Sequence, residues 1–213
     1  MVNNITLEEC VCLRMLNHVC RYLLIFSVFL SIYGCAGPAP KVKLIYPSPP
    51  EEPKIVYLDS YRGESNFEKK GFLEFVLGET TFRAELMKPY GVTAYSDKMY
   101  VTDTGSAVVF VFDLKERKVT FMGDKDMGKL ALPIGVAVTS DGIVFVSDAK
   151  QKRVFGYDAN GNLKIALGKK DEFKNPAGIA VNNALGRLYI VDSYCHMVHV
   201  YSTKGEPLFA FGK

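Results

Sequence analysis

Three aspartates stand out as residues that could carry chemistry. They close three similar segments, YVTD, FVSD and YIVD, and Asp103, Asp148 and Asp192 follow one another at intervals of 45 and 44 residues. Three carboxylates brought together could bind a divalent cation or share acid–base work. An aspartate at the end of a strand also accepts hydrogen bonds from backbone N–H groups of the following turn. Because all three hold the same place in a recurring pattern, we expect them to stabilise turns.

A second candidate is the group formed by Cys195, His196 and His199, residue types that ligate zinc. Residues three apart in an extended strand point to opposite faces, so the two histidine side chains would diverge. We expect His196 to pack or cap a turn, His199 to be solvated and Cys195 to be a small, partly buried residue. The sequence therefore predicts no catalytic residue, no metal site and no cofactor.

The elements that hold these residues recur with them. Gly91, Gly135 and Gly178 each follow a proline by two positions and are spaced by 44 and 43 residues. The segments VTFMG, KIALG and LFAFG end at residues 123, 168 and 212 with a spacing of 45 and 44. Small residues at the start of an innermost strand let neighbouring strands approach closely. The glycines are therefore interpreted as structural positions of a repeat.

Each copy of the repeat contains four short apolar runs, which in the second copy cover residues 135–138, 143–147, 153–157 and 163–167. Asp141-Gly142 and Asn160-Gly161 separate runs and are typical of tight hairpins. Four antiparallel strands in about 44 residues form one blade of a β-propeller. The sequence predicts an all-β fold with blades at 89–123, 133–168 and 176–212. The run 108–112 is apolar on both faces, so we expect a neighbouring blade on each side of it.

The order of motifs resembles the NHL repeat of six-bladed β-propellers. The shared pattern is P-x-G-V/I-A-V, Y-V-x-D, R-V-x-V-F/Y and F-x-G, and it covers the chain from Pro89 to Gly212. The resemblance implies a binding scaffold, although related propellers include lactonases, esterases and peptide-amidating lyases. Those enzymes hold a metal in the central channel, whereas the innermost strands here bring little beyond Thr93, Thr139 and Asn182. An incomplete relative of such an enzyme stays open as the alternative.

The first 34 residues have the features of a bacterial lipoprotein signal peptide. An apolar run at 22–33 is too short to cross a bilayer, which takes about 20 residues, and Arg14 and Arg21 precede it. The segment Ile32-Tyr33-Gly34-Cys35 resembles the lipobox, in which the cysteine is lipidated and becomes the first residue. We expect Cys35 to anchor the protein to a membrane, in the outer membrane facing the periplasm or at the cell surface. Met15 is an alternative start.

The segment between the signal peptide and the blades is expected to hold them away from the membrane. Six of the ten prolines fall within residues 35–53, which predicts an extended polyproline II linker. Residues 54–88 are interpreted as a lead-in with a strand at 54–59 and either a short helix at 67–77 or part of a blade.

The number of blades raises a question, since closed propellers have four to eight. Three blades would expose an apolar face at each end. Two hypotheses follow: the chain is a truncated form, or two copies associate through their open faces.

The net charge of +3 gives no reason to expect a nucleic-acid partner. The expected ligand is an unidentified protein, peptide or glycan.

Overall fold

The computed structural model describes residues 44–67, 84–169 and 171–213. The predicted signal peptide, Cys35 and nearly all of the predicted short helix lie outside these ranges. The chain divides into two compact units, Met1–Asp59 and Ser60–Lys213. Within the described ranges, no helix has the length and apolar character needed to span a membrane.

The described part of the first unit is a small antiparallel ladder. Strand β1 (Ile45–Tyr46) pairs with β2 (Ile55–Val56), with Ile45 opposite Val56. The strand expected at 54–59 is thus limited to two residues. Strand β1 lies within the segment 35–53 expected to be a linker, of which residues 44–53 are described.

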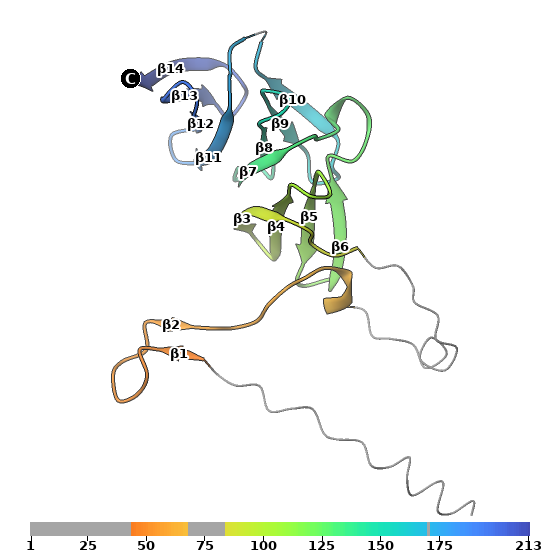
Figure 1. The fold of residues 1–213 in the computed structure, drawn as a ribbon, viewed down its shortest axis with the longest axis vertical. Coiled ribbons are helices and arrows are strands. Elements are labelled where there is room, and N and C mark those ends of the chain that lie inside the picture. Colours follow the sequence, from red (N-terminus) through yellow and green to blue (C-terminus); the bar gives the residue numbers. More distant parts are fainter. Residues whose placement is uncertain (1–43, 68–83, 170) are drawn as a thin grey trace, which may run out of the picture. The chain divides into compact units, whose positions relative to one another are not determined.

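The second unit contains three four-stranded antiparallel sheets, each formed by consecutive strands (Figure 1). Blade 1 comprises β3 (Pro89–Tyr95), β4 (Lys98–Asp103), β5 (Val108–Asp113) and β6 (Lys118–Met122). Blade 2 comprises β7 (Pro133–Val138), β8 (Val144–Asp148), β9 (Arg153–Tyr157) and β10 (Leu163–Leu167). Blade 3 comprises β11 (Pro176–Asn182), β12 (Arg187–Asp192), β13 (Met197–Ser202) and β14 (Pro207–Gly212). The predicted all-β class, a partial β-propeller, is confirmed.

Glycines lie in hairpins of these sheets and at the β-bulge near the start of each blade. Gly142 and Gly161 adopt φ values of 88° and 81° in the hairpins predicted from their sequences, a conformation that favours glycine. The register between the first and second strands shifts near the start of every blade: between Pro89 and Val92, between Pro133 and Val136, and between Pro176 and Ile179. Each shift spans one of the recurring glycines, as expected at a β-bulge.

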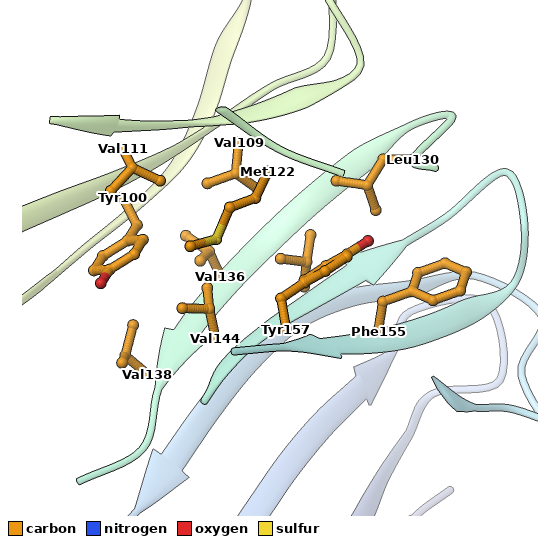
Figure 2. Close-up of a cluster of buried hydrophobic side chains, with 11 residues drawn as sticks. Tyr100, Val109, Val111, Met122, Leu130, Val136, Val138, Val144, Phe155 and Tyr157 are labelled. Carbon is orange, nitrogen blue, oxygen red and sulfur yellow. The ribbon is translucent and has the colours of Figure 1, made fainter. Parts of the chain in front are cut away.

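Side chains between blades 1 and 2 form the largest buried cluster (Figure 2). Val109, Met122 and their neighbours on blade 1 meet Val144 and Tyr157 on blade 2, while Leu130 closes the cluster from the segment joining the two blades. Fully burying one such side chain stabilises the fold by about 1.5–3 kcal/mol. Packing between blades is therefore a main source of stability.

A second cluster joins blades 2 and 3 in the same way. Phe145, Val154 and Leu167 of blade 2 pack against Leu188 and Ile190 of blade 3. Phe173, from the segment between the blades, is 1% exposed and takes the place that Leu130 has in the first cluster. Successive blades therefore use equivalent faces.

The other face of blade 1 is covered by the lead-in segment. Phe112 is fully buried beneath Tyr61 and Phe67, whose rings lie 5.8 and 6.4 Å from its own. The lead-in holds its shape with the 3-10 turn η1 (Glu64–Asn66) and a bridge between Gly63 and Glu85. The expectation that a neighbouring blade covers both sides of residues 108–112 is therefore wrong on this side, because short aromatic segments can also bury a sheet face.

Candidate functional site

Asp103 joins two segments of blade 1 that are far apart in sequence. Its Oδ1 accepts hydrogen bonds from the backbone N–H groups of Gly105 and Ser106, at 2.9 and 2.8 Å, and from the Ser106 hydroxyl. Its Oδ2 accepts bonds from Met87 and Lys88, at 2.7 and 2.8 Å, just before β3 begins. The carboxylate is fully buried. It therefore fixes both the turn after β4 and the start of the innermost strand.

The other two aspartates repeat this arrangement. Asp148 accepts from Gln151 in the following turn and from Ala131 and Leu132 before β7, at 2.6–3.1 Å. Asp192 is likewise fully buried and accepts bonds from the backbone N–H groups of four residues. These four are Tyr194 and Cys195 in the turn and Lys174 and Asn175 before β11. The sequence pointed to the turn partners but not to those before the strand, because no local pattern marks residues 15 to 18 positions away.

These hydrogen bonds lower the pKa of two of the aspartates, Asp103 and Asp192. Burial acts to raise the pKa of Asp103, but hydrogen bonds from Ser106, Lys88 and Met87 outweigh it and hold that pKa below its ordinary value. At Asp192, burial is again outweighed, here by bonds from Lys174, Asn175, Cys195 and Tyr194, and the pKa is lowered. Both side chains are therefore ionised at neutral pH and occupied by backbone donors, which fits a structural role.

The aspartates do not come together as a metal site. Each belongs to its own turn, and within residues 44–67, 84–169 and 171–213 no group of three or more His, Cys, Asp or Glu side chains could hold a metal ion. Each carboxylate is instead bound by backbone N–H groups of its own blade.

The histidines and the cysteine of blade 3 are also separated. His196 lies in the turn with a φ of 55°, and its carbonyl oxygen accepts a bond from Lys213. His199 lies in β13 with its ring edge-on to Phe173 at 5.1 Å and is half-buried, so one side of the ring is packed and the side chain is only partly solvated. Burial, followed by the charge of Asp192, raises the pKa of the Cys195 thiol, which disfavours the thiolate that a nucleophile needs.

Hydroxyl groups next to the aspartates connect neighbouring blades. Thr102 accepts a bond from the Gly91 N–H and donates one to the Ile134 carbonyl of blade 2, both at 2.8 Å. Ser147 repeats this with the Gly135 N–H and the Ala177 carbonyl of blade 3. Val191 holds the equivalent position in blade 3 and has no hydroxyl. These contacts were not anticipated from the sequence, although the series Thr, Ser, Val is visible there.

The three turns after the aspartates form a set of exposed loops, here called the turn face: residues 104–107, 149–152 and 193–196. Their sequences differ completely, TGSA, AKQK and SYCH, although their backbones are held by the same aspartate contacts. Tyr194 is 74% exposed, and Lys150, Gln151 and Lys152 are also exposed. A fixed backbone carrying variable polar and aromatic side chains is suited to binding.

Two hollows lie beside the outer strands. One, of about 290 Å³, is lined by Arg153, Glu172 and Tyr201 among others. Within it the Tyr201 hydroxyl donates to Glu172, which also accepts from the Lys169 N–H. Burial, followed by the bond to Glu172, raises the Tyr201 pKa, so the hydroxyl stays protonated. The other, of about 340 Å³, is lined by residues 124–128 and 160–163 together with Phe121. In the first hollow, Tyr201 and Glu172 therefore already bond to each other.

No protein-family model matches the chain. Over 115 residues the chain is 30% identical to the probable peptidyl-alpha-hydroxyglycine alpha-amidating lyase pgal-1 of Caenorhabditis elegans. That alignment covers 50% of this chain and 33% of the relative, so the chain spans about a third of the relative's length.

Solved structures of similar fold include lyases and a repeat protein. The virginiamycin B lyase of Staphylococcus aureus superimposes with a TM-score of 0.50 at 16% identity, covering 62% of this chain and 45% of the lyase. The WD40 repeats of RRP9 give a TM-score of 0.51 at 12% identity, covering 62% of this chain and 40% of that one. At such identities the likeness concerns the fold alone. The chain is thus a β-propeller protein whose described part contains three blades.

Proposed function

We propose that this protein is a lipid-anchored, extracytoplasmic scaffold of the NHL-repeat type that binds a protein, peptide or glycan through its turn face. The observation that carries the proposal is the contrast within the turns. Buried aspartates fix the three backbones, while the exposed side chains differ from blade to blade. Loops on a rigid fold acquire binding specificity when the same backbone geometry carries different side chains.

Binding through the turn face can be tested with two chemical libraries. We expect binders selected from a random-peptide display library or a glycan array to lose at least tenfold in affinity when Tyr194→Ala and Lys152→Ala are combined. The matched control is Lys204→Ala, at the opposite end of β13, which should leave affinity unchanged. Equal losses from both sets of changes, or no selected binder, would contradict the proposal.

The lipid anchor rests on the lipobox-like segment that ends at Cys35. Expressed in a bacterial host supplied with an alkyne-tagged fatty acid, the chain should become labelled and fractionate with membranes. Cys35→Ala should abolish labelling, whereas Cys195→Ala should keep it. Labelling that survives Cys35→Ala would disprove an anchor at this residue.

A second candidate is a lyase activity, favoured by the 30% identity to the Caenorhabditis elegans lyase. The test is incubation of the purified chain, with and without added Zn²⁺ or Ca²⁺, with a peptidyl-alpha-hydroxyglycine. Mass spectrometry would then follow formation of the amidated peptide. The scaffold proposal predicts no turnover above the protein-free control.

A further inference from the structure

Four exposed cations lie together on blade 2, at and beside its turn in the turn face. Lys150 and Lys152 belong to that turn, Arg153 follows it directly, and all three side chains are exposed. Lys169 follows β10 and is exposed as well. A Cβ placed on Gly168 would lie 2.9 Å from the carbonyl oxygen of Lys152, so the segment that carries Lys169 starts against this turn. The four side chains are here called the basic patch.

This charge is particular to blade 2. The residues that correspond to Arg153 are Val108 in blade 1 and Met197 in blade 3. The residue that corresponds to Lys169 in blade 1 is Asp124, which has the opposite charge. The turns of the other two blades, TGSA and SYCH, contain neither lysine nor arginine. The repeat itself therefore does not require cations at these positions.

Other lysines of the same blades are paired with carboxylates, unlike the basic patch. Lys164 lies 3.2 Å from Asp158, and Lys174 lies 3.2 Å from Asp171. In the part of the chain that the structure describes, no ion pair includes a member of the basic patch. The neighbouring Asp148 is fully buried and accepts backbone hydrogen bonds. The basic patch therefore presents four positive charges to the solvent.

The hollow of about 290 Å³ lies next to these charges, because Arg153 and Lys169 both line it. Its two other polar side chains, Tyr201 and Glu172, hydrogen-bond to each other, and Glu172 also accepts from the Lys169 N–H. Apolar side chains complete the lining: Ala166, Leu167 and Pro207. The groups available to a ligand are therefore mainly cations and apolar surface.

We propose that the basic patch binds an acidic peptide segment, which places carboxylates on the cations and an apolar side chain in the hollow. The assignment rests on the proposed binding role of the turn face and names the chemistry of its ligand. Carboxylates accept charge-assisted hydrogen bonds from lysine and arginine side chains. Opposite charges on the two partners also speed their encounter and disfavour wrong partners.

Two observations favour a peptide over a glycan or a phosphate group. The hydroxyls of a glycan need several hydrogen-bonding partners, whereas Tyr201 and Glu172 in the hollow already bond to each other. A phosphate is commonly held by successive backbone N–H groups of a turn. In this turn the Gln151 N–H is already bound to Asp148, at 2.8 Å.

The test is fluorescence anisotropy of two labelled peptides with the full chain in a mild non-ionic detergent. One peptide has a central leucine flanked by glutamates, and in the other peptide glutamines replace the glutamates. We expect the acidic peptide to bind at least tenfold more tightly than the glutamine peptide. Replacing its leucine with glycine should weaken binding at least threefold, because the hollow then holds no apolar side chain.

Charge reversal in the protein locates the binding site. Lys150→Glu combined with Lys152→Glu should lower the affinity for the acidic peptide at least tenfold. The matched control is Lys115→Glu combined with Lys204→Glu, since both are exposed lysines in hairpins at the opposite end of the blades. It changes the net charge equally and should leave the affinity within twofold. Circular dichroism of each variant shows whether the fold is kept.

Three results would overturn the proposal. The first is an equal loss of affinity in both pairs of variants, which would mean that net charge rather than the basic patch holds the peptide. The second is binding of a labelled heparin oligosaccharide without binding of the acidic peptide, which would indicate an anionic glycan. The third is a set of library-selected binders that need Tyr194 but contain no acidic residue, which would leave the turn-face proposal standing.

Discussion

The buried aspartates show how one residue can organise a blade. Each accepts hydrogen bonds from the turn after the second strand and from the segment before the first strand. That turn and that segment therefore cannot move apart without exposing the carboxylate. Hydrogen bonds to a charged group contribute about 1.5–3 kcal/mol each, more than neutral ones. The repeat therefore concentrates much of its local stability on these side chains.

Replacing Asp192 with Asn should destabilise the protein by about 2–4 kcal/mol, because one carboxylate oxygen that accepts N–H bonds becomes an amide donor. Urea unfolding followed by circular dichroism would measure the change. Asp141→Asn, in an exposed hairpin, should change the free energy of unfolding by less than about 0.5 kcal/mol. Similar effects of the two substitutions would contradict the structural role of Asp192.

Stability should also fall in acid. The pKa values of Asp103 and Asp192 are lower in the folded chain than the ordinary value, about 3.9 in an unfolded one. Their contribution is therefore present above about pH 4 and is lost as the pH falls through the lower folded values. Melting temperatures between pH 7 and pH 2.5 should decline below pH 4, and less steeply in Asp192→Asn. An equally steep decline in the variant would argue against this titration.

The hydroxyl contact between blades gives a separate test. Thr102→Val leaves the Gly91 N–H and the Ile134 carbonyl without this partner and should cost about 1–3 kcal/mol. Val191→Thr, at the equivalent position of blade 3, should change the free energy of unfolding by less than about 0.5 kcal/mol. Thermal unfolding of both variants would distinguish a contact between blades from a general intolerance of substitution at the second strand.

At the scale of elements, the blades are held by what packs on their faces. Blade 2 has a blade on each side, whereas blade 1 has blade 2 on one side and the aromatic lead-in segment on the other. Arg117 adds to that cover, with its guanidinium 5.4 Å from the centre of the Phe67 ring. The lead-in segment thus belongs structurally to blade 1.

Phe112→Ala should cost about 3–5 kcal/mol, since the side chain is fully buried beneath the lead-in. Phe67→Ala should cost less, about 1–3 kcal/mol, because Phe67 is only half-buried. Chemical denaturation would measure both. Met127→Ala, where the side chain is 88% exposed, should have almost no effect. A neutral Phe67→Ala would show that the lead-in does not stabilise blade 1.

The strands of each blade could be predicted from the sequence because their signals are local. Hairpin pairs such as Asp141-Gly142, alternating apolar residues and a strict repeat determine where strands begin and end. The packing of the lead-in segment on Phe112 could not be predicted, since the sequence of an apolar strand does not indicate which segment will bury it. The second set of contacts to Asp192 was missed for the same reason: they join residues that become neighbours only in the folded sheet.

At the scale of the whole molecule, hydrogen bonds join successive blades at both ends of the innermost strands. Thr102 and Ser147 link successive blades near the turn face. Near the opposite end, the Tyr95 hydroxyl donates to the Ser140 carbonyl, and the Ser140 N–H donates to the Asn183 side chain. The turns of all three blades are therefore displayed on one connected framework, which is what a binding scaffold requires.

The claim on which the account depends is that the chain folds as successive four-stranded blades stabilised by their shared faces. Amide hydrogen–deuterium exchange, resolved by mass spectrometry, tests it most directly. We predict slow exchange in three separate groups of amides that repeat about every 44 residues. Exchange should be slowest in the strand pairs β4–β5, β8–β9 and β12–β13. In the turn between β4 and β5, and in the equivalent turns of the other blades, the N–H groups bound to the aspartates should also be protected. Exchange that is uniformly fast over residues 89–212, or protection that does not repeat with this period, would contradict it.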